Sequence, residues 1–195
     1  MLVLLAAFAS LRWGEVIALR RSDVDLKAGA VRVRAALTER STGEIALGPP
    51  KSRAGRRVVG IPSVIFPALA EHLSAFSSPG PDGLVFPGLK GGPLRRGNFN
   101  KQAAWPKAVE TIGAKGLHFH DLRHSGNAWA ATSGAGLRDL MARMGHDSER
   151  AAIIYQHQAR GADAVITQAI DAHADAELRP DDEGDGGAWR VVPVG

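Results

Sequence analysis

The sequence contains no cysteine, and this absence excludes disulfide bonds, thiolate catalysis and zinc sites with cysteine ligands. No hydrophobic run is long enough to cross a bilayer, and the apolar opening segment MLVLLAAFAS lacks the preceding basic residues of a secretory leader. We therefore interpret this segment as a core helix, and we expect a cytoplasmic location and no membrane partner. Aromatic residues are also few, and Tyr155 is the single tyrosine in the chain.

Charge is unevenly distributed along the chain. The whole chain carries +4 and residues 175–195 carry −4, from six acids against two bases, which leaves +8 for residues 1–174. A basic body with an acidic end indicates a polyanionic partner, although charge that serves only solubility is an equal alternative at this point. We predict one domain over residues 1–175 and an acidic, disordered tail over residues 176–195.

Hydrophobic periodicity predicts a mostly α-helical α+β domain. A helix is expected to start at Pro62, and Pro106 is expected to kink or break the helix over 98–112. The other predicted helices span residues 2–9, 13–20, 120–132, 137–144, 149–159 and 163–174. The predicted strands span residues 31–34, 44–47 and 56–61, and we expect them to form one small antiparallel three-stranded sheet packed on helices. The connection over 48–55 is basic and rich in turn residues.

The densest group of chemically active side chains is HFHDLRHS, residues 118–125. If a helix starts near His120, then Arg123 and His124 lie on the same face as His120. These residues fit three interpretations: a metal site with His118, an anion site built on the arginine fork, or an ordinary polar helix face. The metal interpretation is the weakest, because no carboxylate pattern completes the ligand set and the arginine cation stands where a metal would bind.

Further candidates lie in three other segments. Arg12 stands at a helix start with Glu15 three residues later, and Lys51 lies in the basic connection. His146 directly follows the glycine that ends a predicted helix, and Tyr155 lies nine positions after it on the next one.

These segments, in this order, resemble the catalytic domain of the tyrosine recombinases, the phage-integrase family. The resemblance rests on FASLRWGEVIALRRSDVD, PPKSRAGRRVVGIP, HDLRH and MGHDSERAAIIYQH, and it extends from residue 1 to about 174. Two positions depart from the family pattern, since Ser10 replaces a common glycine and Met144 replaces a common leucine. Family members usually carry a helical core-binding domain before the catalytic one, and we expect that this chain lacks that domain and part of the first catalytic helix.

The resemblance implies site-specific DNA recombination and integration through a 3′-phosphotyrosyl intermediate. Tyr155 would be the nucleophile. A phenol is a weak nucleophile unless its proton is removed and the resulting anion is stabilised. Arg12 and Arg123 would bind the non-bridging phosphate oxygens. His120 would accept the tyrosine proton or donate to phosphate.

The remaining implied roles concern the leaving group and the surroundings of the site. His146 would hydrogen-bond a non-bridging oxygen, and Lys51 would protonate the leaving 5′-oxygen. Glu15 and His124 are expected to support these groups without touching the substrate, and His124 is expected to be buried. The residues expected near DNA phosphates are Arg53, Arg56 and Arg57.

The implied partners are double-stranded DNA and further copies of the chain, as a tetramer on DNA, with no cofactor and no metal. Two alternatives remain open. One is a relaxing enzyme similar to the type IB topoisomerases, which use the same phosphotyrosine chemistry and reseal the same strand. The other is a non-catalytic DNA-binding fragment.

Overall fold

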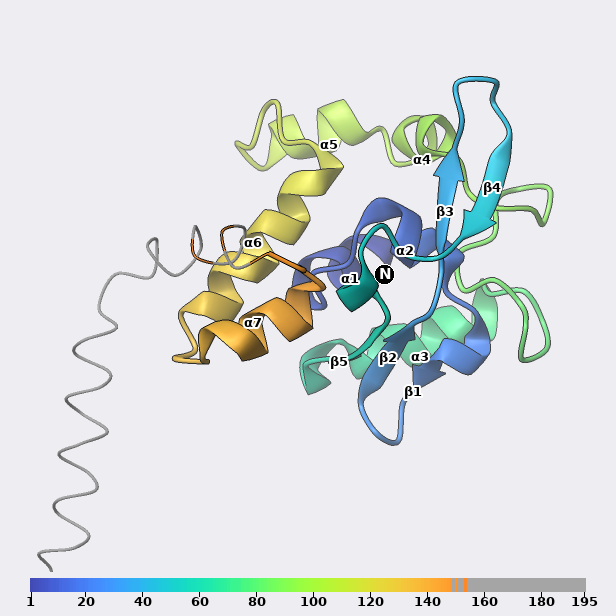
Figure 1. Cartoon of the computed structure of the whole chain (residues 1–195). Helices are drawn as coiled ribbons and strands as arrows, with labels where there is room; N and C mark the ends of the chain where they lie inside the picture. The colour runs from blue at the N-terminus through green and yellow to red at the C-terminus, as the bar shows by residue number, and fades with distance from the viewer. Residues whose placement is uncertain (149, 151–152, 154–195) are drawn as a thin grey trace, which may run out of the picture. The chain divides into compact units, whose positions relative to one another are not determined.

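The computed structural model describes residues 1–148, 150 and 153 of the chain (Figure 1). Of the predicted helix over 149–159 only residues 150 and 153 are described, and both are helical; the predicted helix over 163–174, the predicted disordered tail and Tyr155 lie outside the described residues. None of the helices in the described part is long and apolar enough to cross a membrane.

The described part is mostly helical with short strands, as the sequence predicts. The helices are α1 (Leu2–Phe8), α2 (Trp13–Ala18), α3 (Phe66–Ala75), α4 (Arg96–Gln102), α5 (Trp105–Thr111), α6 (Phe119–Ala131) and α7 (Leu137–Met144). The strands are β1 (Val24–Asp25), β2 (Ala30–Val33), β3 (Ala36–Glu39), β4 (Ile45–Gly48) and β5 (Arg57–Gly60). Three 3₁₀ turns complete this set, namely η1 (Arg21–Asp23), η2 (Arg53–Gly55) and η3 (Ser63–Ile65).

The strands form an antiparallel three-stranded sheet, in the order β1-β2-β5, and a separate β3-β4 hairpin. Val31 and Val33 of β2 are buried while Arg32 between them is exposed, which is the alternation of a half-exposed strand. The prediction that residues 44–47 join this sheet is wrong, because they pair with Ala36–Glu39 in the hairpin. The third strand of the sheet is β1, which at two residues is too short to show a periodic pattern.

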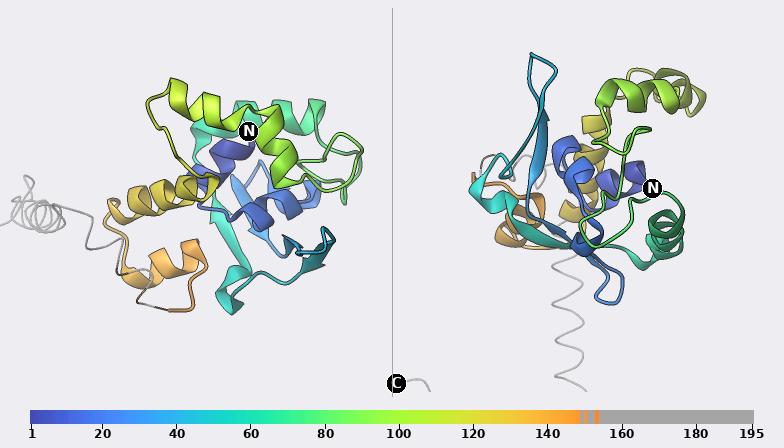
Figure 2. Two further views of the ribbon diagram at one scale, coloured as in Figure 1. Left: turned by 90° about the horizontal axis from the view of Figure 1, so that it is seen from above. Right: turned by 90° about the vertical axis from the view of Figure 1, so that its right-hand side faces the viewer.

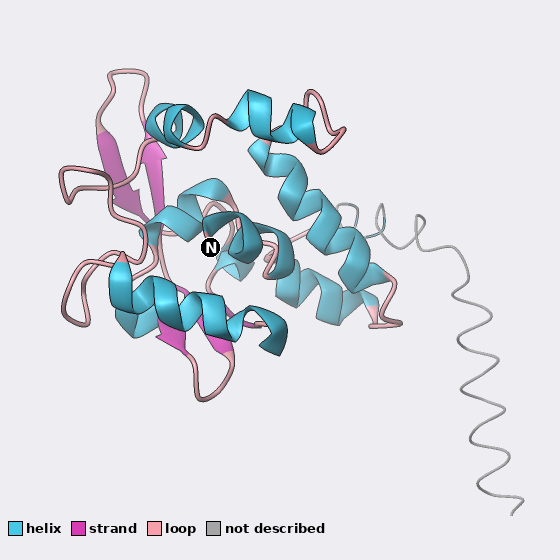
Figure 3. Ribbon diagram, turned by 180° about the vertical axis from the view of Figure 1, so that it is seen from behind, coloured by secondary structure: helices cyan, strands magenta, loops and turns pink. Residues whose placement is uncertain are grey.

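The core lies between the sheet and the helices. Helix α3 covers one face of the three-stranded sheet and contributes the buried Leu69 (Figure 3). Helix α1 packs against α6, and the two backbones approach so closely that a Cβ on Gly126 would lie 1.9 Å from the carbonyl oxygen of Ala7. The apolar opening segment is therefore a core helix, as predicted, and its close contact fixes the position of α6.

The predicted helix over 98–112 is interrupted, as its proline suggests. Helix α4 ends before Ala103, Ala104 takes a left-handed conformation with φ of 43°, and Pro106 lies in the first turn of α5. Figure 2 shows α4 and α5 on one side of the domain and the β3-β4 hairpin extending away from the three-stranded sheet. The space between α2, the hairpin and the start of α4 is where the candidate site begins.

Candidate active site

Arg12 is held at the start of α2 by Glu15. Its backbone N–H donates to Glu15 Oε2 at 2.9 Å, and its Nη1 donates to Glu15 Oε1 at 2.9 Å. A third bond runs from Arg12 Nη2 to the carbonyl oxygen of Gly145 at 3.2 Å. The guanidinium is thereby fixed between the start of α2 and the loop that follows α7, and 22% of its side chain remains exposed.

Arg123 projects from α6 into the same region and is 3% exposed. Its Nη1 donates to the carbonyl oxygen of Ser10, and its Nη2 donates to that of Met144 and to His146 Nε2, the last at 3.0 Å. Ser10 has a φ of +53°, a left-handed conformation that non-glycine residues rarely adopt. Helix α6, the segment before Arg12 and the end of α7 are thus joined by one buried guanidinium.

His146 is neutral at physiological pH. Partial burial and the positive charges of Arg123, Arg12 and Arg57 lower its pKa to about 4, against a smaller opposing effect of Asp147. A guanidinium only donates hydrogen bonds, so His146 Nε2 accepts from Arg123 and the neutral ring carries its proton on Nδ1. A neutral imidazole beside two arginines suits proton transfer and hydrogen bonding to an anion.

His120 and His124 lie together on the exposed face of α6, with ring centroids 4.8 Å apart in an edge-on arrangement. The pKa of His120 is lowered by partial desolvation and by the neighbouring charges of His124, Arg123 and Arg12. The expectation that His124 is buried is wrong, because the turn of α6 places it on the solvent side. Within residues 1–148, no group of three histidine or carboxylate side chains is arranged to hold a metal ion.

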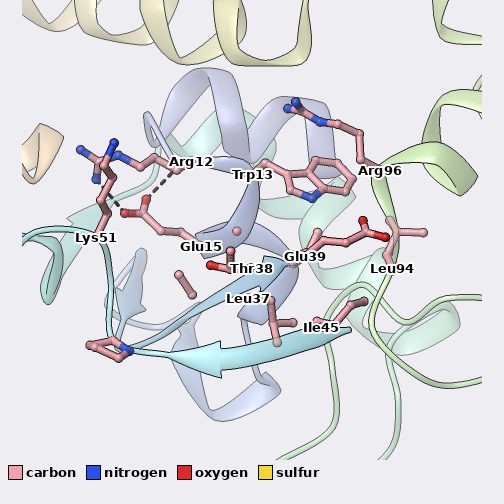
Figure 4. A pocket seen from close by; sticks show the side chains of 14 residues that line it. Arg12, Trp13, Glu15, Leu37, Thr38, Glu39, Ile45, Lys51, Leu94 and Arg96 are labelled. Carbon is pink, nitrogen blue, oxygen red and sulfur yellow. Dashed lines mark hydrogen bonds and ion pairs between the residues drawn. The ribbon is translucent and has the colours of Figure 1, made fainter. Parts of the chain in front are cut away.

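Lys51 lies on an exposed bend between β4 and β5, and it lines a cavity of about 570 Å³ together with Arg12, Glu15 and Arg96. Figure 4 shows Lys51 at the same end of this cavity as Arg12 and Glu15. The structure therefore brings the lysine of the basic connection to the first arginine of the set.

The segment that follows Lys51 is attached to the loop after α7. Ser52 Oγ donates to the carbonyl oxygen of Gly145 at 2.8 Å. The backbone N–H groups of Arg53 and Ala54 donate to the carboxylate of Asp147 at 2.9 Å and 2.7 Å. Because His146 lies between these two anchor points, its loop and the segment after Lys51 are held together.

The interpretation of Arg57 as a DNA-facing residue is wrong. Its side chain is 5% exposed, and its guanidinium forms a fork with Glu15, from Nη1 to Oε1 at 3.1 Å and from Nη2 to Oε2 at 3.0 Å. Arg57 occupies the same face of β5 as the buried Val59, so the period-two rule of strands contains the signal for its burial. Arg53 and Arg56 are exposed, and their contact with DNA stays a prediction.

Glu15 is a buried carboxylate, 1% exposed, that accepts two hydrogen bonds from Arg12 and two from Arg57. Desolvation raises its pKa, but the hydrogen bonds and charges of the two arginines outweigh this and leave the pKa below its ordinary value. The carboxylate is therefore ionised. Taken together, these contacts bring Arg12, Lys51, Arg123 and His146 into one site, with His120 on the adjoining face of α6.

The model of the family described as "Phage integrase family" matches residues 1–161. The putative prophage phiRv2 integrase of Mycobacterium tuberculosis is 40% identical over 164 residues, which cover 84% of this chain and 44% of that protein. The integrase of Mycobacterium phage L5 is 32% identical over 168 residues, with the same two coverages. The chain thus spans less than half the length of these relatives.

A solved structure of similar fold is the Tn1549 transposon integrase in complex with transposon right end DNA. The TM-score is 0.68 at 17% identity, and the match covers 78% of this chain and 52% of that one. At this identity the likeness concerns the fold.

Proposed function

Since the chain belongs to the phage integrase family, we propose that it acts as the catalytic domain of a tyrosine recombinase, which breaks and rejoins DNA strands through a 3′-phosphotyrosyl link. Tyr155 is the nucleophile in this proposal. The phenol oxygen attacks the scissile phosphorus, the bond to the 5′-oxygen breaks, and the phosphate passes to the tyrosine. A 5′-hydroxyl of another strand later reverses the step, so neither ATP nor an external oxidant or reductant is needed.

The observation that carries the proposal is the convergence of Arg12 and Arg123 on the loop after α7. Both guanidinium groups donate to carbonyl oxygens at the end of that helix, and Arg123 also donates to the neutral His146 that follows. A phosphodiester is an anion that repels an attacking phenolate, and fixed cations stabilise the charge that develops on its non-bridging oxygens. An arginine pair anchored before substrate arrives supplies that stabilisation without reorganisation.

The proton transfers are assigned to the other members of the set. His120, whose pKa is lowered, is neutral near pH 7 and accepts the proton of the tyrosine hydroxyl. Lys51 donates a proton to the leaving 5′-oxygen from its exposed bend. His146 is assigned as the hydrogen-bond partner of a non-bridging oxygen, which requires the ring to turn, because the Nδ1 atom that carries its proton is buried in the described structure. Glu15 touches no substrate and holds Arg12 in place.

Duplex DNA is the proposed substrate and partner. It is supported by the +8 charge of residues 1–174, by the exposed Arg53 and Arg56 close in sequence to Lys51, and by relatives of similar fold bound to DNA. Each copy of the chain supplies one tyrosine, and exchange between two duplexes requires four strand breaks. We therefore propose a tetramer on DNA.

The test is covalent trapping. The chain is incubated with a pool of duplexes that carry a nick and randomised flanking sequence, so that a short 5′-fragment diffuses away after cleavage and leaves the protein on the 3′-phosphate. Mapping of the attached residue by peptide mass spectrometry is expected to identify Tyr155. Tyr155→Phe is expected to lose the adduct while salt-sensitive DNA binding persists. An adduct in the phenylalanine variant contradicts the assignment, and relaxation of a plasmid without a recombination site indicates topoisomerase activity instead.

A further inference from the structure

Arg57 uses its whole guanidinium inside the protein. Besides the fork with Glu15, its Nη1 donates to the carbonyl oxygen of Gly55 at 3.0 Å, and its Nε donates to that of Arg143 at 2.8 Å. One side chain of β5 therefore contacts α2, the turn after Lys51 and the last turn of α7. No resemblance or motif assigned it this position.

The first consequence concerns Arg12. The two oxygens of Glu15 receive four hydrogen bonds, of which Arg57 supplies two and Arg12 supplies two. A buried carboxylate that loses half of its donors must turn, take up water or become protonated, because an underpaired buried charge is costly. Each of these changes moves the acceptor that fixes the Arg12 side chain.

The second consequence concerns the loop that carries His146. Arg57 Nε holds the carbonyl oxygen of Arg143, in the last turn of α7, and its Nη1 lies so near Gly145 that an added Cβ there would be 2.9 Å away. Gly145 also has a φ of +63°, so glycine is required at this position for two reasons. The carbonyl oxygen of this glycine accepts from Arg12.

We propose that Arg57 is a positioning residue for DNA cleavage, which holds Arg12 through Glu15 and holds the His146 loop through the carbonyl oxygen of Arg143. The inference rests on the proposed function, since it assigns to Arg57 a part in that reaction. Arginine is needed because the N–H groups of its rigid, planar guanidinium point in different directions. They reach four acceptors, which are the two carboxylate oxygens of Glu15 and the carbonyl oxygens of Gly55 and Arg143. A lysine ammonium keeps the charge but donates from a single point and cannot reach both the carboxylate and the end of α7.

Three variants separate positioning from folding. Arg57→Lys keeps the positive charge beside Glu15, so it tests the fork with little loss of stability. The double variant Arg57→Met with Glu15→Gln removes both charges of the buried pair, so neither is left without the other, but it also takes the carboxylate from Arg12, and the effect of Arg57 alone is therefore read from Arg57→Lys. Arg40→Met is the matched control, since it removes a surface arginine–glutamate pair whose side chains are 58% and 61% exposed.

The experiment measures the rate of covalent trapping on the nicked duplex, alongside thermal unfolding. Arg57→Lys is expected to cleave about tenfold more slowly than the wild type, and the double variant about a hundredfold more slowly. A catalytic group that is misplaced by about 1 Å can cost about a hundredfold in rate. Arg40→Met is expected to stay within about twofold of the wild type. All variants are expected to unfold cooperatively.

A substrate change tells positioning from general damage. A methylphosphonate at the scissile position replaces one charged oxygen by methyl and makes the diester neutral, so attack depends much less on well-placed cations. The Arg57 variants are expected to approach wild-type rates on this substrate, as Arg12→Ala should. If the folded variants cleave ordinary DNA at the wild-type rate, or stay slow on the methylphosphonate, the proposal for Arg57 is overturned.

An NMR measurement tests the position of Arg12 without relying on DNA cleavage. The Nε–H resonance of Arg12, identified by its loss in Arg12→Lys, is expected to shift in Arg57→Lys and to stay in place in Arg40→Met. If the wild type forms no adduct, the proposed function fails, and Arg57 is then judged by this resonance alone. An unchanged resonance in folded Arg57→Lys shows that Arg57 does not hold Arg12.

Discussion

Arg123 Nη2 lies 3.0 Å from His146 Nε2, so the second arginine of the site donates to an imidazole whose pKa is lowered to about 4. The relationship links α6 to the loop after α7 and depends on a neutral histidine ring. A protonated ring has no lone pair for the guanidinium and repels it. The contact is therefore a pH-sensitive part of the fold as well as of the site.

The free energy of unfolding is expected to fall as the pH drops from about 6.5 to about 4. The unfolded histidine binds a proton below about 6.5, whereas the folded His146 does so only near 4, so protons favour the unfolded chain between these values. Below about 4 both states are protonated and the effect levels off. Because the ring is partly exposed, we expect a contribution on the order of 1 kcal/mol.

Urea unfolding of the wild type and of His146→Gln at intervals of pH measures this contribution. The glutamine accepts from Arg123 through its side-chain oxygen but does not titrate. His72 and His120 also have lowered pKa values and change stability in the same direction, so only the difference between the two proteins reports on His146. A difference that is constant from pH 7 to pH 4 contradicts the assignment.

Ser10→Gly is expected to stabilise the protein by about 1 kcal/mol. Ser10 is fully buried with a φ of +53°, and its Oγ has no hydrogen-bond partner within the described part of the chain. Glycine relieves roughly 1–2 kcal/mol of left-handed strain in the folded protein and removes the cost of burying the hydroxyl. The greater backbone entropy of glycine in the unfolded chain opposes this gain by about 0.5–1 kcal/mol. Thermal unfolding is expected to shift upward by about 2–4 °C.

Ser10→Ala is the control for this prediction. It removes the hydroxyl and keeps the Cβ, so it should gain less than the glycine variant. The carbonyl oxygen of residue 10, which accepts from Arg123, is retained in both, so covalent trapping should stay at the wild-type rate. An alanine variant more stable than the glycine variant would mean that strain at this position is negligible.

The sequence predicts most of the fold, and the structure brings Arg12, Lys51, Arg123 and His146 together, while their roles and the place of Tyr155 stay predictions. The helices are long enough to show their periodicity, and the side chains of the site occur in segments whose chemistry is recognisable without knowledge of their contacts. The two-residue β1 and the weakly patterned β3, with Leu37 as its one buried residue, carry no such signal. The sequence therefore predicts the wrong third strand for the sheet, residues 44–47 in place of β1.

Arg57 illustrates a different limit. The sequence analysis expects Arg57 near DNA, whereas in the structure it shares the face of the buried Val59 and pairs with Glu15. That pairing joins α2 to β5 across 42 positions, so it depends on the packing of the whole domain. The hydrogen bond from the Ser52 hydroxyl to the carbonyl oxygen of Gly145 joins residues 93 positions apart, so it likewise cannot be predicted from the local sequence pattern.

Lys51→Ala is expected to slow covalent trapping on ordinary DNA by about a hundredfold or more, as loss of a general acid does. The leaving 5′-oxygen is then expelled as an unprotonated alkoxide. A substrate with sulfur at the bridging 5′-position has a leaving group that needs no proton. It is expected to restore most of the rate, measured as covalent product per unit time.

The same sulfur substrate gives the control. Arg12→Ala lacks stabilisation of the non-bridging oxygens, which the bridging sulfur does not supply, so it is expected to stay slow. Lys51 and Arg12 line the same end of one cavity, so the two variants change neighbouring side chains. In the proposal, Lys51 acts on the leaving 5′-oxygen and Arg12 acts on the non-bridging oxygens. Equal rescue of both would assign a leaving-group role to Arg12, and rescue of neither would remove Lys51 from the proton transfer.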